Sequence, residues 1–499
     1  MSPAPSAESS LPGLWDDLVV AVAVCLPLVL FALTERRLAG FAGFPLDDSW
    51  IHLHFARNIA EGAGFSYNPG VPMAGSTAPL WTLLLALGVV LFGSSLAVVK
   101  AIGITTALTA TIMVRRAARA WGACRLGALG AAIGFAWTGP MAWGALSGME
   151  VTLAALLVAT SLLSHARGRD VWTAVGAALA ALARPEAIIL VPLFVVARRL
   201  TIRRALLFGA ITLAVLAPAV AFSLATVGSP VPATASAKIE GGLLGWLAGV
   251  REPARVTWLW RPAAFFAGWV CWLWTTDWLL PLALGAALTL VWRRAGRALA
   301  LPALVLVVHP LAMALLAPYR DPAFQEGRYS IHLLPIAFVV LAVALGERLT
   351  RPRLAMVVLY LVLAIAALGP AAARYGWAVQ NINAMQVHLG HWVDAHLPKR
   401  EVIALNDIGA IAYLSRREVI DLVGLVSPDV LRYRDAGDEG ILRYLLERCP
   451  GHVIVFPAWY PRMTARSDLL EPVYRVRLDH NTVGGADEMV VYRLLRCGL

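Results

Sequence analysis

The chain has 499 residues, of which 59% are hydrophobic and only 15% charged, and its mean hydropathy is +0.70. Soluble domains carry about 25% charged residues, so this composition excludes a soluble globular protein and an intrinsically disordered one. The formal net charge is +11, yet residues 371–499 hold 15 basic and 15 acidic side chains. The whole excess therefore lies in residues 1–370, where it indicates loop orientation rather than a nucleic-acid partner.

The positive charge is concentrated in five short segments that together hold 16 arginines and two acidic residues. Because basic residues are disfavoured in translocated loops, we expect these segments to face the cytoplasm. They are 115–125, 165–171, 198–204, 293–298 and 347–353. Threading the apolar runs between them predicts a polytopic α-helical membrane protein of about 11 helices, since each crossing needs roughly 20 apolar residues. The N-terminus is then cytoplasmic.

The first span, 14–34, lacks a basic n-region and a small-residue cleavage site, which indicates an anchor rather than a cleaved signal peptide. The run 78–92 is short for a crossing and is expected to re-enter the membrane or lie on its surface. In 171–197, Arg184-Pro185-Glu186 interrupts the apolar run and predicts two short helices that meet inside the membrane. The remaining predicted spans are 95–114, 126–146, 149–164, 205–223, 275–292, 299–317, 331–346 and 354–370.

Two outer loops are long, 35–78 and 224–262. Tryptophans cluster at the end of the second loop and beyond it: Trp258, Trp260, Trp269, Trp272, Trp274 and Trp278. This density predicts a helix along the membrane surface, and ordinary interfacial tryptophans are the alternative.

Residues 371–499 are long enough for a separate domain, and alternating strands and helices predict an α/β domain outside the membrane. No G-x-G-x-x-G follows a strand, so nucleotide binding has no support. Cys449 and Cys497 can pair only if the strands beside them are antiparallel neighbours, and the sequence leaves a disulfide and two free thiols equally open. The expected strands are 402–405, 419–420, 453–456 and 489–492, and the expected helices 376–396, 409–414 and 438–448.

The first outer loop holds the most distinctive polar residues. Asp47 and Asp48 stand side by side at the start of a helical pattern that is expected to lie on the membrane, with His52 four residues after Asp48. Close carboxylates raise the pKa of one of them, which suits a general base. Asp and Ser are also good helix N-caps, and the loop alone favours the interpretation as a cap. Two ligands do not make a metal site, so no metal is predicted.

Other charged residues fall at membrane depth or on the same outer side. Arg184 and Glu186 interrupt a membrane segment, where ionisable groups are costly and usually functional; a structural ion pair is the alternative. Glu150 either caps the next helix or faces a cavity. Lys238 and Arg328 lie in outer loops, where the alternative is solvated charge. An acidic pair and three cations would suit an anionic, membrane-borne substrate, whereas ATP-driven transport has no support without a Walker A motif.

These residues resemble the GT-C class of integral-membrane glycosyltransferases, and the mycobacterial terminal arabinofuranosyltransferases in particular. The similarity covers most of the chain and extends into the predicted outer domain. The similar stretches are Asp47-Asp48-Ser49-Trp50-Ile51, Gly75-Ser76-Thr77-Ala78-Pro79-Leu80-Trp81, Ser147-Gly148-Met149-Glu150, Arg184-Pro185-Glu186, Pro230 to Lys238, Gly327-Arg328-Tyr329, Asn406-Asp407-Ile408-Gly409-Ala410 and Asp421-Leu422-Val423-Gly424-Leu425.

The resemblance implies an inverting glycosyltransferase that moves a sugar from a polyprenyl-phosphate donor to an envelope acceptor hydroxyl, on the outer side of a bacterial inner membrane. It implies Asp47 or Asp48 as the base, with Asp47 favoured. No cofactor is implied beyond the lipid-linked donor, and a divalent metal has no support in the sequence. Arg184, Lys238 and Arg328 would bind the donor phosphate, and His52, Glu150, Glu186 and Trp81 would bind substrate.

Two non-catalytic functions are the alternatives. A lipid or sugar transporter predicts a pathway across the whole bilayer and, usually, inverted repeats, whereas the candidate residues fall on one side and no repeat is found. An assembly protein would bind envelope glycan through its tail without turnover.

Overall fold

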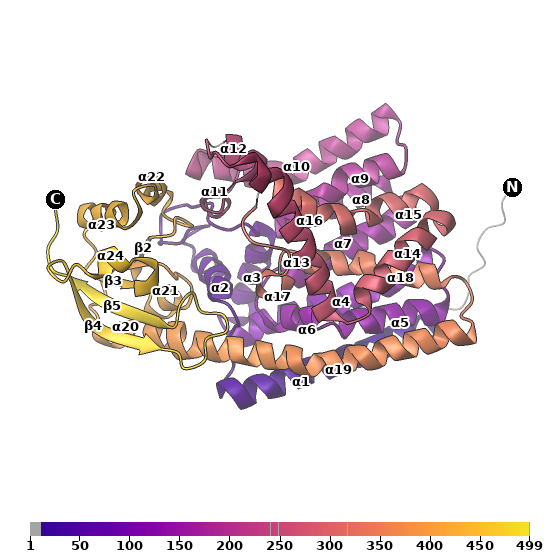
Figure 1. Cartoon of the computed structure of the whole chain (residues 1–499), viewed down its shortest axis with the longest axis horizontal. Coiled ribbons are helices and arrows are strands. Elements are labelled where there is room, and N and C mark those ends of the chain that lie inside the picture. Colours follow the sequence, from indigo (N-terminus) through magenta and orange to yellow (C-terminus); the bar gives the residue numbers. More distant parts are fainter. Residues whose placement is uncertain (1–10, 240, 248, 317, 499) are drawn as a thin grey trace.

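The computed structural model describes residues 11–239, 241–247, 249–316 and 318–498. Figure 1 shows a helical part and, beside it, a smaller tail domain that contains the only sheet of the described residues. Within the same ranges, six helical segments are long and apolar enough to cross a membrane, and two bent helix pairs could each form one more. The six are Gly13–Ala39, Leu96–Ala120, Ile202–Val227, Gly296–Leu316, Phe324–Leu345 and Arg351–His396.

The predicted span 126–146 is two helices in the structure, α5 (Arg125–Ala136) and α6 (Gly139–Leu146). The break has a local cause, because Thr138 accepts the Met141 N–H as an N-cap at 3.4 Å and Pro140, which lacks an N–H, suits only a first turn. A second bend, of 118°, separates α6 from α7 (Val151–Ala166).

The predicted interruption at Arg184-Pro185-Glu186 is confirmed. Helix α8 (Asp170–Ala183) ends there, and the chain continues as the 3-10 turn η1 (Pro185–Ile189) and helix α9 (Leu190–Ala197). Proline restricts the preceding residue to extended backbone, and Arg184 has φ −144° and ψ 113°. The interruption therefore places ionisable side chains at the junction of two short apolar helices.

The tryptophan-rich segment forms η2 (Val256–Trp260) and α13 (Arg261–Thr276), which bends by 108° into α14 (Leu280–Arg294). Trp258 and Trp260 are exposed, as a helix at a membrane surface requires. Trp272 is instead buried, and its indole N–H donates to the Glu326 carbonyl at 3.1 Å. The buried Trp272 therefore does not fit an exposed surface helix, and for Trp258 and Trp260 the surface position stays a prediction.

The tail contains a five-stranded sheet in the order β2-β1-β3-β5-β4. Strand β1 pairs in parallel with β2 and β3, and β5 pairs antiparallel with β3 and β4. The sequence did not predict β4, an edge strand in which half of the side chains are exposed and which lacks an apolar run. The bounds are β1 Val402–Leu405, β2 Glu418–Asp421, β3 His452–Val455, β4 Leu470–Arg477 and β5 Glu488–Leu494.

Cys449 and Cys497 form a disulfide with a Cα–Cα distance of 5.4 Å. The sequence allows this bond only if the strands beside the two cysteines are antiparallel neighbours. Strands β3 and β5 are such neighbours. The bond joins the chain just before β3 to the chain just after β5. It thereby closes the sheet domain at its C-terminal end.

The predicted domain boundary at residue 371 lies inside a continuous helix. Helix α19 (Arg351–Ile382) runs without interruption through the π-turn η4 (Asn383–Val387) into α20 (His388–His396). The membrane part is thus joined to the tail by helix rather than by a flexible linker.

Helix α2 (Asp47–Ala60), which is expected to lie on the membrane, is buried between the helical part and the tail. Its Ile51 and Phe55 pack into the core of the tail. Its Trp50 and Leu53 pack on the opposite side, against a cluster centred on α3 (Pro79–Phe92). The helix that begins with the acidic pair is therefore held from both sides, as Figure 1 shows.

Candidate active site

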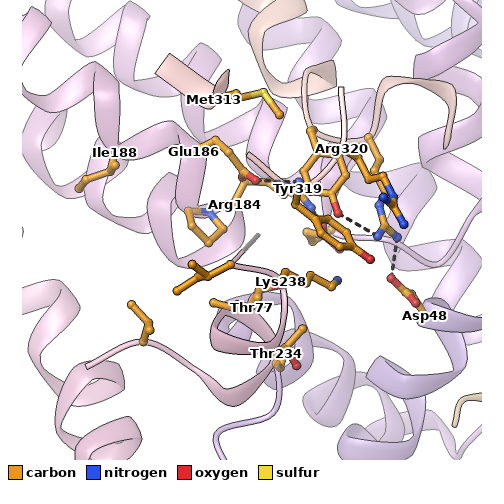
Figure 2. A pocket seen from close by; sticks show the side chains of 18 of the residues that line it. Asp48, Thr77, Arg184, Glu186, Ile188, Thr234, Lys238, Met313, Tyr319 and Arg320 are labelled. Atoms are coloured by element: carbon orange, nitrogen blue, oxygen red, sulfur yellow. Dashed lines mark hydrogen bonds and ion pairs between the residues drawn. The ribbon is translucent and has the colours of Figure 1, made fainter. Parts of the chain in front are cut away.

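A cavity of about 400 Å³ lies among α2, the break between α6 and α7, the break between α8 and α9, α16 (Val305–Leu316) and the short helix α11 (Ala233–Ala237). Figure 2 shows its polar side chains pointing toward one another. Seven of the nine side chains singled out from the sequence line this cavity: Asp48, His52, Glu150, Arg184, Glu186, Lys238 and Arg328. Two of these side chains, Asp48 and Arg328, are 280 residues apart in the sequence and form a hydrogen bond in the cavity.

The two adjacent aspartates have different surroundings. Asp48 lines the cavity, and its Oδ2 accepts a hydrogen bond from Arg328 Nη1 at 2.6 Å. Burial would raise the pKa of Asp48, but the charges of Arg328 and Lys238 outweigh burial and lower this pKa to about 2. Asp48 is therefore ionised at neutral pH.

Asp47 points away from the cavity, toward the tail. Its two carboxylate oxygens accept the backbone N–H groups of Gly409 and Ala410 at 2.6 and 2.8 Å. Burial, together with the nearby Asp407 carboxyl, raises the pKa of Asp47. The sequence favours Asp47 as the base, but Asp48 is the aspartate that faces the cavity. The carboxylate of Asp47 is instead hydrogen-bonded to the tail.

The cations of the cavity are interleaved with aromatic rings. Arg184 and Arg328 lie over the Tyr329 ring, with guanidinium carbons 4.6 and 5.1 Å from its centroid. Arg328 Nη2 also donates to the Tyr329 hydroxyl at 3.1 Å. Lys238 Nζ lies 5.3 Å from the centroid of Tyr319. Cation–π contacts hold these side chains in place without neutralising their charge.

A second polar group lies where the helices break. Arg184 Nη1 donates to Glu150 Oε1 at 2.5 Å, and Arg184 Nη2 donates to Glu186 at 3.2 Å. His52 Nε2 lies 3.4 Å from Glu150 Oε2, and its Nδ1 lies 3.2 Å from Thr82 Oγ1. The Glu150 side chain makes no capping hydrogen bond to α7, so of the two interpretations left open, the structure favours the cavity. The Arg184–Glu186 ion pair exists, and both residues still line the cavity.

The rest of the lining is largely apolar. It includes side chains from η1, α12 (Gly242–Leu247) and α16. They are Ile188, Ile189, Leu244, Ala312, Met313 and Leu316. The cavity thus combines a charged end with an apolar end, which suits a ligand that has a polar head and a hydrocarbon chain.

Trp81 does not line the cavity, so its predicted contact with substrate lacks structural support. Its side chain is fully buried, and its indole N–H donates to the Gly148 carbonyl at 2.9 Å. Because Gly148 lies two residues before Glu150, Trp81 supports the turn that places this carboxylate. Its role is one of packing and position.

Among the lining residues that the sequence did not single out for a role in the site are His309, Tyr319 and Leu425. His309 had a usable signal, since an ionisable side chain in a predicted span is functional by default. Leu425 belongs to the tail, and nothing in the local pattern shows that it reaches the membrane part. In the described ranges, no group of three or more His, Cys, Asp or Glu side chains could hold a metal ion.

Comparison with solved structures defines the class of fold. ArnT from Cupriavidus metallidurans, solved with undecaprenyl phosphate, aligns over 95% of this chain and 97% of its own, with 13% identity and a TM-score of 0.57. AglB, the oligosaccharyltransferase of Archaeoglobus fulgidus, solved with an inhibitory peptide and a dolichol-phosphate, aligns over 96% of this chain and 75% of its own, with 14% identity and a TM-score of 0.59. The chain is an integral-membrane protein with the GT-C fold, as the resemblance indicated.

A third similar structure is the arabinofuranosyltransferase AftD from mycobacteria, with 17% identity and a TM-score of 0.50. It aligns with 95% of this chain, which spans only 41% of the AftD chain. Residues 379–492 of the tail match a protein family described as a domain of unknown function, DUF8728. No curated protein sequence matches the chain.

Proposed function

We propose that the chain is a glycosyltransferase that moves a sugar from a polyprenyl-phosphate donor to an acceptor hydroxyl, with inversion at the anomeric carbon. The supporting observation is that one cavity joins the Asp48 carboxylate, a group of buried cations and an apolar end. A lipid-linked sugar phosphate requires all three: a base for the acceptor, cations for the phosphate and apolar surface for the lipid. The GT-C fold, shared with proteins solved with lipid phosphates, agrees with this proposal.

Asp48 is the proposed base. It is ionised and faces the cavity, whereas both oxygens of Asp47 accept hydrogen bonds from the tail. Arg328 donates to Asp48, and a donor phosphate that bound the same guanidinium would compete for it. Losing this partner would raise the pKa of Asp48 from about 2 toward its ordinary value and make the carboxylate a stronger base.

In the proposed reaction the acceptor hydroxyl gives its proton to Asp48 while its oxygen attacks the anomeric carbon. The bond from that carbon to the phosphate oxygen breaks, and the electron pair leaves with the lipid phosphate. Arg328 and Lys238 stabilise the charge that develops there. Lys238 forms no ion pair with the described residues, so its charge is available, whereas Arg184 is shared between Glu150 and Glu186.

The sugar is proposed to lie beside His52, Glu150 and Glu186. Glu186 Oε2 is buried and accepts no hydrogen bond within the described part of the chain, and the partner nearest to Glu150 Oε2 is His52 Nε2 at 3.4 Å. A buried acceptor without a donor is costly, and sugar hydroxyls are suitable donors.

The reaction is proposed to occur on the outer side of a bacterial inner membrane, with the N-terminus in the cytoplasm. The support is the net +14 of the five arginine-rich segments, together with the Cys449–Cys497 disulfide, which suits an oxidising compartment. The tail is then extracytoplasmic. An envelope acceptor would meet the lipid-linked donor on that side.

The test is to incubate the purified full chain with a panel of polyprenyl-phosphate sugars and candidate acceptors and to measure release of the lipid phosphate. Asp48→Asn should lower kcat by about 100-fold to 10,000-fold while the chain stays folded, since an amide cannot take the proton. An Asp48→Asn protein with unchanged kcat would refute the assignment of the base. Glycan or lipid binding without turnover across the panel would favour an assembly protein or a transporter.

A further inference from the structure

The tail contacts the segment that begins with the acidic pair. Asp47 accepts the N–H groups of Gly409 and Ala410, in the turn that follows β1. About three turns further along α2, Arg57 Nη1 donates to the Tyr413 carbonyl at 2.6 Å. These contacts join residues more than 350 positions apart and bury the first three turns of α2 against the tail.

The tail also contacts the segment that ends with Lys238. Arg434 Nη1 donates to the Ala237 carbonyl at 3.1 Å, directly before Lys238. The Thr234 hydroxyl donates to the Leu425 carbonyl at 3.2 Å and also to the Gly75 carbonyl. Leu425 itself lines the cavity. The tail thus contacts both α2 and α11, and Figure 1 shows these two helices on its side of the helical part.

We propose that the tail domain is a built-in part of the catalytic centre, in which Asp47 is a positioning residue that aims Asp48 and the Arg434 contact places Lys238. The inference rests on the proposed function and adds a role for the tail. It contrasts with a tail that acts as an independent glycan-binding module. If the tail is part of the catalytic centre, breaking its contacts with α2 and α11 lowers catalysis or donor binding. If it is an independent module, breaking them leaves both unchanged.

The geometry explains why Asp47 can control its neighbour. Successive residues of an α-helix are rotated by about 100°, so Asp47 and Asp48 diverge in direction and move as one rigid unit. Fixing the Asp47 carboxylate on two N–H groups fixes the rotation of the first turn of α2. A shift of roughly 1 Å at a reacting group can cost about 100-fold in rate.

Gly409 makes this contact possible. A Cβ at this position would overlap the Asp47 backbone oxygen and lie 2.6 Å from the Asp47 carboxyl carbon. Its φ of −71° is negative, so no left-handed backbone requires glycine here, and the overlap with Asp47 is the main strain that alanine would add. Gly409→Ala therefore displaces α2 from the tail without changing any ionisable group.

The first arm of the experiment compares Gly409→Ala and Asp47→Asn with the unaltered chain. An Asn at 47 has one acceptor oxygen for two N–H groups, so it keeps the size but loses one contact. Both variants should lower kcat by roughly tenfold to 100-fold and change the KM for the lipid-linked donor less than about threefold. Gly369→Ala is the matched control, since a Cβ there meets nothing within 4 Å in α19.

The second arm uses Arg434→Ala, an exposed side chain whose loss should leave the tail folded. It should raise the Kd for a short-chain polyprenyl phosphate by roughly threefold to tenfold, the range of one hydrogen bond, with kcat nearly unchanged. The first two variants should thus change mainly kcat, and Arg434→Ala mainly the Kd. A general loss of stability would not produce these two different effects. Thermal unfolding of each variant identifies any that fail to fold.

The outcomes separate this inference from the proposed function. If the unaltered chain releases no lipid phosphate from any donor, the proposed function fails first. If it is active, and folded Gly409→Ala keeps both its kcat and its KM, the tail does not aim Asp48 and the inference is refuted. If Gly409→Ala is too unstable to assay, the same decision rests on Asp47→Asn, and unchanged kcat in that folded variant refutes the inference.

Discussion

Arg328 is the residue whose replacement tests the cavity most directly. The structure gives it one hydrogen bond to Asp48 at 2.6 Å, one to the Tyr329 hydroxyl at 3.1 Å and a contact with the Tyr329 ring. Only 4% of its surface is exposed. Charge-assisted hydrogen bonds contribute about 1.5–3 kcal/mol each, so one lost contact to a transition-state phosphate corresponds to roughly tenfold to 150-fold in rate.

Arg328→Met removes the charge and every hydrogen bond, and should lower kcat/KM by about 100-fold to 1,000-fold. Arg328→Lys keeps the charge but not the planar fork that contacts two partners at once, so its loss should be intermediate, near tenfold. In Arg328→Met the pKa of Asp48 should also rise from about 2, because Arg328 is the strongest influence that lowers it. The acid limb of the pH–rate profile should then move to higher pH.

The assay is lipid-phosphate release from the polyprenyl-phosphate sugar that the unaltered chain accepts, followed across pH. Arg320→Met is the comparison at the same cavity, since Arg320 is exposed and its guanidinium contacts aromatic rings rather than a carboxylate. Its loss should stay below about tenfold. Wild-type kcat/KM in folded Arg328→Met, or equal losses in the two variants, would refute the reasoning.

Three further predictions concern the tail and the orientation of the chain. Replacing both Cys449 and Cys497 by Ser opens a link between residues 48 apart and should lower the free energy of unfolding of the tail by about 4 kcal/mol, measured with denaturant; equal unfolding of oxidised and reduced chain would contradict this. Burial raises the pKa of Asp421 to about 6, so its contribution to stability is present below about pH 4 and is lost as pH rises through 6, by roughly 3 kcal/mol at most. Asp421→Asn should flatten that slope in pH-dependent unfolding, and an unchanged slope would place its cause elsewhere. A single cysteine at exposed Arg348, in a chain whose three free cysteines are replaced, should react with an impermeant thiol reagent only after permeabilisation; labelling of intact cells would reverse the proposed orientation.

Much of the fold is visible in the sequence because two local rules are strong in this chain. Apolar runs separated by arginine-rich segments mark the spans, and Pro185 marks a helix break without any knowledge of its neighbours. Strand β1 is equally plain, since its four apolar residues form a central buried strand. Strand β4 is not, because an edge strand with alternating exposed charges resembles a loop in composition.

The site was predictable as a set of residue types but not as a geometry. Seven of the nine predicted side chains line the cavity. They could be selected from the sequence because ionisable residues are rare in an apolar membrane chain and are usually functional there. The choice between Asp47 and Asp48 was beyond the sequence, since it depends on backbone groups at Gly409 and Ala410, about 360 residues away. Trp81 shows the same limit, because its partner at Gly148 becomes a neighbour only through folding.

The uninterrupted helix from Arg351 to His396 has a mechanical consequence. At about 1.5 Å per residue its 46 residues form a rod of roughly 70 Å, and a rod resists bending far more than a loop does. One end of this rod would lie in the lipid and the other under the sheet, so a tilt imposed on it by a thicker or thinner bilayer would rotate the sheet as well. The contacts that the sheet domain makes with α2 and α11 would then respond to the lipid composition of the membrane.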